Sequence, residues 1–278
     1  MKICELHDRL YDILIIIDKI CRENDIPYWV HGGTAIGAVR ERDFIPWDDD
    51  LDIKIMSEDY EAFREAMIKN LPSHLHLIEP PDFYPYFYDM VIRILDDRWF
   101  LRKEKPEDKA YKDYTNRVGI DVFLSCGCPK SAIAQKLFIL QNTILYGMCM
   151  RFRKTIDYSK YTMIQKVQVA VLRCLGKIYS GNTPERIYRT WFKFIKSYDA
   201  NKTGWRIMIN SPIGMYYMVP LPNEWFNGTV YSKIRQLNVP LIAGYDQELR
   251  FIYGNYMVPE RNTNKYYVHL DDEDFDEV

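Results

Sequence analysis

Apolar side chains recur at helical spacing along the first part of the chain. They stand three or four positions apart, at Ile3, Leu6, Leu10, Ile13, Leu14 and Ile17. This spacing places them on one face of a helix, which would cover one side of a core. We therefore predict an amphipathic helix over residues 4–24, ended by the segment Asp25-Ile26-Pro27.

Farther along, apolar and polar residues alternate in short runs, which is the pattern of strands. The runs that we expect to form strands are 28–31, 50–56, 74–79, 88–95, 119–123 and 205–210, with 99–102 pairing with 88–95. Helical spacing returns between them, at 34–40, 59–69 and 246–253. Strands interleaved with helices predict an α+β (α/β) fold, in which helices flank a mixed sheet.

Two glycines follow the first short strand. Gly32 and Gly33 precede Thr34 at the start of the predicted helix 34–40. Glycine lets the backbone turn tightly and approach a ligand, and free N–H groups at a helix start favour a phosphate. We therefore predict phosphate contacts from these three residues. Arg40, at the end of the helix, would contact phosphate or the acids that follow, or it would form a structural ion pair.

An acidic run comes next, at Asp48, Asp49, Asp50 and Asp52. On a strand, period two points Asp50 and Asp52 to one face. Carboxylates this close need a counter-charge, and Mg²⁺, with Mn²⁺ as an alternative, prefers such oxygen ligands. Asp48 and Asp49 would flank the site and orient its loop. A Gly-Gly pair alone is usually a turn and an acidic run alone is usually a solvated loop, but their order here predicts a metal–phosphate site.

This order of motifs is typical of a nucleotidyltransferase-type fold. The segment GGTAIGAVRERDFIPWDDDLDI, residues 32–53, closely resembles the LicD family. Members of that family transfer phosphorylcholine or related phospho-alcohols from a CDP-activated donor to a sugar. Fukutin-related proteins share the pattern and use CDP-ribitol. The segment 240–259 resembles the C-terminal part of LicD proteins, with Asn255 in place of an acid.

The resemblance implies two further site residues. Ile120-Asp121-Val122-Phe123 matches a family strand that carries a third carboxylate, so Asp121 would complete the metal site. Arg93 would contact the donor phosphate, since family members tend to carry a basic residue in that strand. The chain departs from the family pattern after both strands, at Asp97-Arg98 and at Leu124-Ser125-Cys126.

A basic stretch follows the predicted sheet strands. Its apolar spacing predicts helices over 131–152, 160–180 and 184–198. Residues 130–198 hold 13 Lys or Arg and two acids, a formal charge of +11, whereas the whole chain has −2. The stretch would meet an anionic membrane or a lipid-linked acceptor, or it would draw in the CDP donor. Solvated helix faces are the third interpretation.

These patterns suggest one folding unit with three parts. We expect residues 1–128 to form the catalytic core and 129–200 to form a basic helical region packed on it. Residues 201–278 would complete the domain and end in an acidic tail over 270–278.

The bulk composition narrows the classes of protein. The chain has 278 residues and a pI near 6.2, which does not suggest nucleic-acid binding. Its six cysteines are scattered and form no zinc set, as expected of reduced thiols in a cytosol. The first residues are charged, unlike a secretory signal, and no apolar run reaches the ~18 residues of a membrane span. We expect a cytoplasmic protein, with peripheral contact at the inner face of the membrane left open.

Together the motifs predict a Mg²⁺-dependent phosphotransferase. CDP-choline is the favoured donor among CDP-alcohols, and the acceptor would be a cell-surface glycan, such as lipopolysaccharide or teichoic acid, or a lipid-linked sugar. Asp121 would act as general base and CMP would leave. The alternatives are a nucleotidyltransferase that moves NMP from an NTP, a non-catalytic nucleotide- or glycan-binding relative, and a membrane-associated scaffold.

Overall fold

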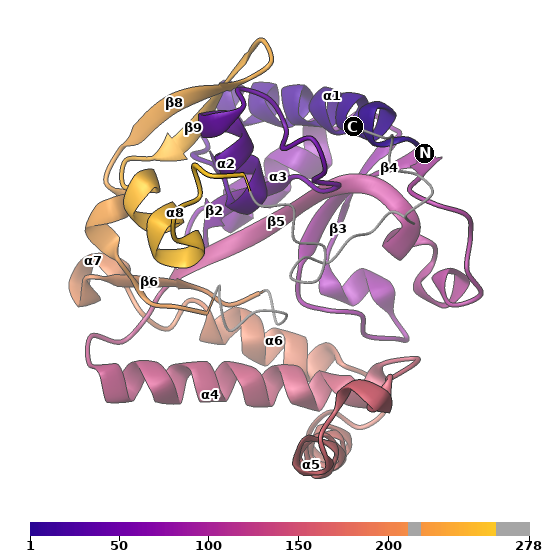
Figure 1. Cartoon of the computed structure of the whole chain (residues 1–278). Helices are drawn as coiled ribbons and strands as arrows, with labels where there is room; N and C mark the ends of the chain where they lie inside the picture. The colour runs from indigo at the N-terminus through magenta and orange to yellow at the C-terminus, as the bar shows by residue number, and fades with distance from the viewer. Residues whose placement is uncertain (211–217, 260–278) are drawn as a thin grey trace.

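A seven-stranded mixed sheet lies at the centre of the computed structural model, which describes residues 1–210 and 218–259 (Figure 1). Its path runs β1-β2-β5-β4-β3, and β6 pairs with both β5 and β7. The strands are β1 Trp29–Val30, β2 Asp52–Met56, β3 Leu75–Ile78, β4 Ile92–Phe100, β5 Arg117–Gly127, β6 Trp205–Met208 and β7 Leu221–Pro222. The pair β2–β5 is parallel and the others are antiparallel.

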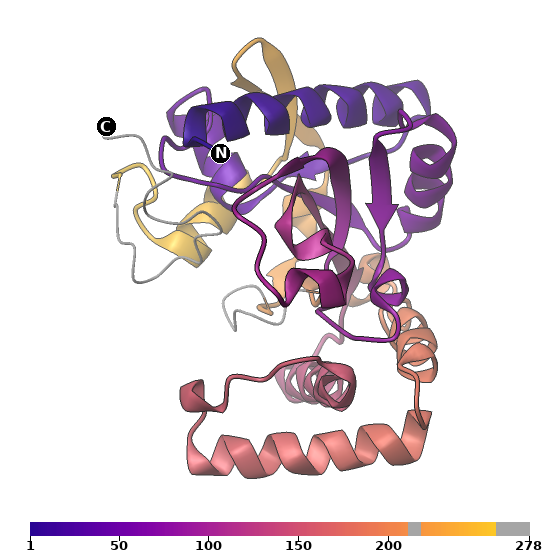
Figure 2. The same ribbon diagram turned by 90° about the vertical axis from the view of Figure 1, so that its right-hand side faces the viewer.

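Helices cover the sheet and extend beyond it. They are α1 Ile3–Glu23, α2 Gly32–Arg40, α3 Tyr60–Asn70, α4 Ala132–Cys149, α5 Met163–Ser180, α6 Glu185–Phe194, α7 Ala200–Thr203 and α8 Tyr245–Tyr253. Helix α1 lies along one side of the sheet, whereas α4 and α5 lie at the opposite end of the molecule (Figures 1 and 2). This arrangement confirms the α+β fold expected from the sequence. None of the helices in the described ranges is both long and apolar enough to cross a bilayer.

The apolar face predicted for the first helix is the face that α1 buries. Leu6, Leu14 and Ile17 are fully shielded from solvent there. They join one apolar cluster that also contains residues of the sheet, of α4 and α6, and of α8. Burying this stripe therefore holds α1 across the strands that carry the candidate site residues.

Several predicted strand boundaries were wrong, among them that of the strand expected over 88–95, which begins at Ile92. The strand expected from Asp50 begins at Asp52, where pairing with β5 starts, so Asp50 lies in the preceding loop. Residues 99–102 do not form a separate partner strand, because β4 runs on to Phe100. The register of β4 against β5 shifts after Asp96, whose carboxylate accepts hydrogen bonds from the backbone and side chain of Arg98.

A hairpin that the sequence pattern did not predict packs beside α2. Its strands are β8 Thr229–Ile234 and β9 Leu237–Ile242. The two-residue turn places Arg235 at φ 55°, a conformation for which glycine or asparagine is the usual signal. Ser232 donates a hydrogen bond of 2.6 Å to the carbonyl of Ala38, which ties the hairpin to α2.

The three helices predicted for the basic stretch are confirmed as α4, α5 and α6. Helices α4 and α6 end earlier than predicted, whereas α5 begins later and ends at Ser180 as expected. A 3₁₀ turn at Met150–Phe152 replaces the predicted end of the first helix, and another at Tyr158–Lys160 precedes α5. The predicted acidic tail lies outside the described residues.

A buried ion pair joins the C-terminal helix to the sheet. Lys54 of β2 donates to Glu248 of α8 at 2.5 Å, and the two side chains are 1% and 5% exposed. Burial lowers the pKa of the Lys54 ammonium group, although Glu248 opposes this shift. The pair therefore fixes α8 against the strand that begins at Asp52.

Removing one partner of this pair should destabilise the fold. In Lys54→Met the Glu248 carboxylate keeps its buried position without a cation, so the free energy of unfolding should fall by about 3–5 kcal/mol. Urea denaturation measures this change. The double variant Lys54→Met/Glu248→Leu should recover most of the loss, since no buried charge remains. A single variant as stable as the parent would show that the pair does not anchor α8.

Candidate active site

Two carboxylates meet because β2 and β5 are parallel neighbours. Asp52, the first residue of β2, is the register partner of Asp121 on β5. Residues at the same register on adjacent strands point to the same face of the sheet, about 4.8 Å apart at the backbone. The backbone N–H of Asp121 also bonds to the carbonyl of Leu51 at 3.0 Å. The pairing predicted from the sequence as a consequence of the family resemblance is thus present in the sheet.

Three more carboxylates come from the loop before β2. Asp48, Asp49 and Asp50 each offer a carboxylate oxygen, and these oxygens all lie within 4.8 Å of one another. We refer to Asp48, Asp49, Asp50, Asp52 and Asp121 as the acidic cluster. The oxygens of Asp48, Asp49 and Asp50 would repel one another when ionised, and a hard divalent cation is the usual partner of such a set.

Burial and charge crowding raise the pKa of two carboxyl groups in the acidic cluster. Burial raises the pKa of Asp52 well above its usual range, and the charges of Asp50, Asp121 and Asp48 raise it further. Burial and the neighbouring Asp50 and Asp49 likewise raise the pKa of Asp48. The cluster therefore favours binding a positive charge, whether that charge is a proton or a metal ion.

Arg93 supplies part of the positive charge. On β4 it is the register partner of Asp121, and its Nε lies 3.1 Å from that carboxylate. Its two terminal nitrogens donate to the buried Asp89, at 2.8 and 2.6 Å. Arg93 also lowers the pKa of Asp52. Arg93, which we predicted to contact the donor phosphate, thus lies beside the acidic cluster as a counter-ion held by Asp89 and Asp121.

Arg40 makes a different set of contacts. Its guanidinium donates to Glu41 at 2.6 Å and to the backbone carbonyl of Tyr256 at 2.7 Å. These bonds are those of the structural ion pair that the sequence left open, and they tie the end of α2 to the chain after α8. Arg40 still lowers the pKa of Asp48, so its charge acts on the acidic cluster.

The start of α2 faces the acidic cluster. The helix begins at Gly32, two residues earlier than predicted, and Gly32 has φ +58°. A Cβ at Gly32 would stand 3.0 Å from Asp52 Oδ2, and one at Gly33 would stand 2.2 Å from Asp48 Oδ2. Side chains at both positions would displace the carboxylates, which is why the sequence needs glycine there.

Thr34, in the first turn of α2, holds the strand that carries Asp52. Its side chain is 2% exposed, and its hydroxyl oxygen accepts a hydrogen bond of 2.8 Å from the backbone N–H of Asp52. The hydroxyl that we predicted as a phosphate donor is therefore engaged with the strand. It links the glycine turn to the carboxylate strand.

Two residues near the site were missed by the sequence analysis. The Tyr253 hydroxyl of α8 lies 3.4 Å from the position that a Cβ of Gly32 would take. His7 of α1 donates from Nε2 to the carbonyl of Asp48 at 2.7 Å, and burial lowers its pKa, which favours the neutral ring. The family-like segment after residue 240 hinted at Tyr253, whereas no local pattern distinguishes His7.

The fold and site define a class of protein. It is an α+β protein in which carboxylates on adjacent parallel strands face the start of a helix that begins with two glycines. Residues 25–117 match the family model described as LicD/FKTN/FKRP, nucleotidyltransferase domain. This range includes the glycines and the acidic run, and it ends before Asp121.

Relatives extend this match. The chain is 22% identical over 262 residues, 92% of each chain, to the lipopolysaccharide cholinephosphotransferase LicD of Haemophilus influenzae. Uncharacterized proteins of Rickettsia typhi and Rickettsia prowazekii are 43% and 48% identical over 58 and 50 residues. Those two alignments cover 21% and 18% of this chain and 19% of each relative. Residues 25–117 therefore match the LicD family model, and the similarity to a LicD protein extends along most of the chain.

Thr34 offers a test of how the site is held. In Thr34→Val the backbone N–H of Asp52 loses its acceptor inside the protein, so the free energy of unfolding should fall by about 1–3 kcal/mol. Thr34→Ser keeps the hydroxyl and should stay close to the parent. Thermal unfolding of both variants measures the difference, and equal melting temperatures would contradict the assigned role.

Proposed function

We propose that the protein is a metal-dependent phosphotransferase. It moves phosphorylcholine, or a related phospho-alcohol such as ribitol phosphate, from a CDP-activated donor to a sugar hydroxyl of a cell-surface glycan or its lipid-linked precursor. The observation that carries the proposal is the acidic cluster at the start of α2. The full-length similarity to a lipopolysaccharide cholinephosphotransferase supports this choice of reaction.

The acidic cluster suits a divalent cation. Its donors are carboxylate oxygens, and burial together with the charges of Asp50, Asp121 and Asp48 raises the pKa of Asp52. Asp50, Asp52 and Asp121 would hold Mg²⁺, or Mn²⁺ in its place, with Asp48 and Asp49 shaping the loop. Bound there, the ion would neutralise charge on the donor diphosphate and on the departing CMP.

The protein's own groups would position the donor. The N–H groups at the start of α2 point out of the helix end, where the helix dipole favours an anion. Gly32 and Gly33 carry no side chain, which lets the carboxylates of Asp52 and Asp48 lie directly against this end of the helix. Arg93 lies next to Asp121 and offsets part of the negative charge that an anionic donor must approach. Positioning and charge compensation are the main catalytic terms in phosphoryl transfer.

Asp121 is our candidate for the general base. In the transfer step the acceptor hydroxyl oxygen forms a bond to the phosphorus that carries the alcohol. The bond from that phosphorus to the CMP oxygen breaks, and the hydroxyl proton passes to the Asp121 carboxylate. A base of this kind must reach the hydroxyl by a hydrogen bond. Asp121 lies inside β5 rather than in a loop, so pairing of β5 with β2 fixes its position relative to Asp52.

A second candidate is a nucleotidyltransferase that transfers NMP from an NTP and releases pyrophosphate. The description of the matching family model favours this possibility. Both reactions would use the same acids, so the geometry of the acidic cluster does not separate them. The donor and the product separate them, since one reaction yields CMP and the other yields pyrophosphate.

Ligand binding gives the first test. With Mg²⁺ present, CDP-choline or another CDP-alcohol should raise the melting temperature, because a ligand at 100 times its Kd stabilises the native state by about 2.7 kcal/mol. Asp50→Asn should abolish this shift. A shift with nucleoside triphosphates alone would favour the second candidate, and no shift with any of them would favour a binding module or a scaffold.

Turnover gives the second test. Asp121→Asn should lower the rate of CMP release by about 10²–10⁴-fold, which is the usual contribution of a general base. Asp52→Asn should abolish turnover and leave the fold intact. The matched control is Asp97→Asn, because Asp97 pairs with His76 on the exposed edge of the sheet and its side chain is 51% exposed. Full activity in Asp52→Asn would refute the metal role.

A further inference from the structure

Helices α4 and α5 expose an unusual number of large apolar side chains. Ile133, Met163 and Ile178 are 76%, 75% and 81% exposed. The others that are exposed on these helices are Leu137, Leu140 and Ile144 on α4, and Ile164, Val167, Val171 and Leu175 on α5. Contiguous exposed apolar surface on this scale marks an interaction site. We call these ten residues the α4–α5 apolar face.

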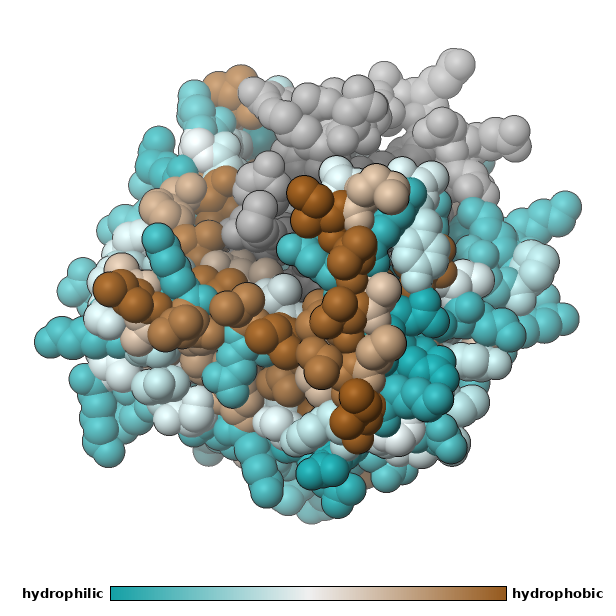
Figure 3. Space-filling model, turned by 90° about the horizontal axis from the view of Figure 1, so that it is seen from below, coloured by the Kyte–Doolittle hydropathy of each residue, from teal (hydrophilic) through white to brown (hydrophobic). Residues whose placement is uncertain are grey.

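The exposed residues form one stripe on each helix. On α4 they are spaced by four, three and four residues, and on α5 the residues from Ile164 to Ile178 are spaced by three or four. Such spacing keeps side chains on one side of a helix. Seen from below, the hydrophobic side chains form a connected band across this end of the molecule (Figure 3). Both stripes therefore belong to a single face.

The fold holds this face rigidly outward. The opposite side of α4 is buried. The rings of Phe138 and Phe194 of α6 stack with their centroids 4.2 Å apart, and Asn142 Oδ1 accepts a hydrogen bond of 2.9 Å from Trp191 Nε1. Helix α5 packs on α4 at two glycines, since a Cβ at Gly147 would meet Leu172 and one at Gly176 would meet Met148. The close approach fixes α5 beneath α4 (Figures 1 and 2). The apolar stripe of α5 stays exposed.

The charge around the face is strongly positive. Residues 131–180 contain eight Lys or Arg and one acid, Asp157, a formal charge of +7. On α5, Lys166, Arg173 and Lys177 lie on the side away from the apolar stripe, as 100° per residue requires. An apolar face with Lys and Arg on the polar side is the pattern of helices that lie in a membrane interface.

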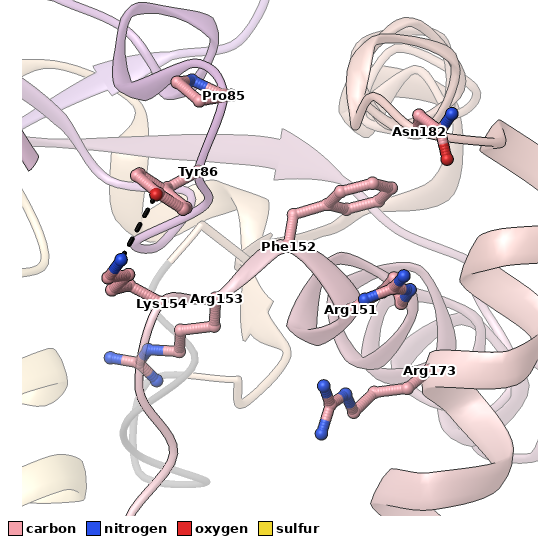
Figure 4. A pocket seen from close by; sticks show the side chains of 8 residues that line it. All are labelled: Pro85, Tyr86, Arg151, Phe152, Arg153, Lys154, Arg173 and Asn182. Carbon is pink, nitrogen blue, oxygen red and sulfur yellow. Dashed lines mark hydrogen bonds between the residues drawn. The ribbon is translucent and has the colours of Figure 1, made fainter. Parts of the chain in front are cut away.

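A basic cavity borders α5. It has a volume of about 270 Å³ and its lining includes Arg151, Arg153, Lys154 and Arg173 (Figure 4). Within residues 1–210 and 218–259, no carboxylate belongs to the lining. Lys154 donates to the Tyr86 hydroxyl at 3.3 Å, and Arg173 donates to the Tyr158 hydroxyl at 2.6 Å. Four cationic side chains around one cavity suit a phosphate group.

We propose that the α4–α5 apolar face docks onto a membrane that contains anionic phospholipid. The two helices lie in the interface plane, their apolar stripes enter the acyl region, and the basic cavity takes a lipid phosphate. Charge complementarity favours this occupant over a second copy of the chain, because pairing two such faces would bring two regions of charge +7 together. The proposal does not depend on the transferase reaction.

Vesicle flotation tests the proposal. The full chain should float with vesicles of equal parts phosphatidylcholine and phosphatidylglycerol, and much less with phosphatidylcholine alone. Val167→Glu/Val171→Glu should weaken binding at least about tenfold, since each valine loses its transfer into the apolar layer. The matched control is Ile68→Glu on α3, which is also exposed, at 60%, and should bind like the parent.

The basic cavity is tested separately. Arg151→Gln and Arg173→Gln should each weaken binding to the anionic vesicles about fivefold, and neither should affect binding to neutral ones. Thermal unfolding checks that every variant is folded, and the donor-binding assay on Val167→Glu/Val171→Glu should match the parent. The membrane result is therefore independent of the catalytic result.

Three outcomes would overturn the proposal. One is a parent protein that does not float with either kind of vesicle. Another is flotation that Val167→Glu/Val171→Glu does not reduce, because a different surface would then hold the membrane. The third is a concentration-dependent dimer, seen by light scattering, that the double variant dissociates while vesicle binding is absent; the face would then join two copies of the chain.

Discussion

Repulsion among five carboxylates is the constraint around which the rest of the site is arranged. Asp52 and Asp121 are neighbours because their strands are parallel, and Asp48 to Asp50 crowd the same place from a loop. The native structure keeps them together at the cost of raised pKa values. In our proposal a bound cation relieves this repulsion, so that binding of the ion and the integrity of the site would be coupled.

Several distant segments share the work of holding that cluster. Thr34 fixes the start of β2, His7 of α1 holds the carbonyl of Asp48, and Arg93 pairs with Asp121 across the sheet. The buried pair Lys54–Glu248 brings α8 to the same strand, and with it the Tyr253 hydroxyl. Each contact connects the cluster to a different helix or strand, and none of these elements could position the carboxylates by itself. The site is therefore a property of the whole sheet and its first and last helices.

Helices α4 and α5 differ from the rest of the fold because they leave many apolar side chains exposed. Helix α4 divides its surface between a buried side, which packs on α6, and an apolar side that stays exposed. Helix α5 is attached to it by close contact at glycines rather than by burial of its own stripe. Packing within the monomer buries the apolar side chains of α4 only in part and those of α5 hardly at all. This exposure points to a partner outside the chain.

The sequence determined the local elements and the candidate chemistry. Helical and strand periods located α1, the basic helices and most strands, and the glycines and acids of residues 32–53 located the site, because these signals depend on neighbours a few positions apart. Asp121 entered the prediction only through family resemblance, since pairing of β2 with β5 joins residues far apart in the chain.

Tertiary structure alone decided which groups act on one another. It placed the Arg93 guanidinium between Asp89 and Asp121, turned Arg40 to the backbone of Tyr256, and began β2 at Asp52 rather than Asp50. It also set the stripes of α4 and α5 on a single face (Figure 3). The physical reason is that strand register, helix packing and charge pairing are set by contacts across the fold, which no short-range pattern encodes.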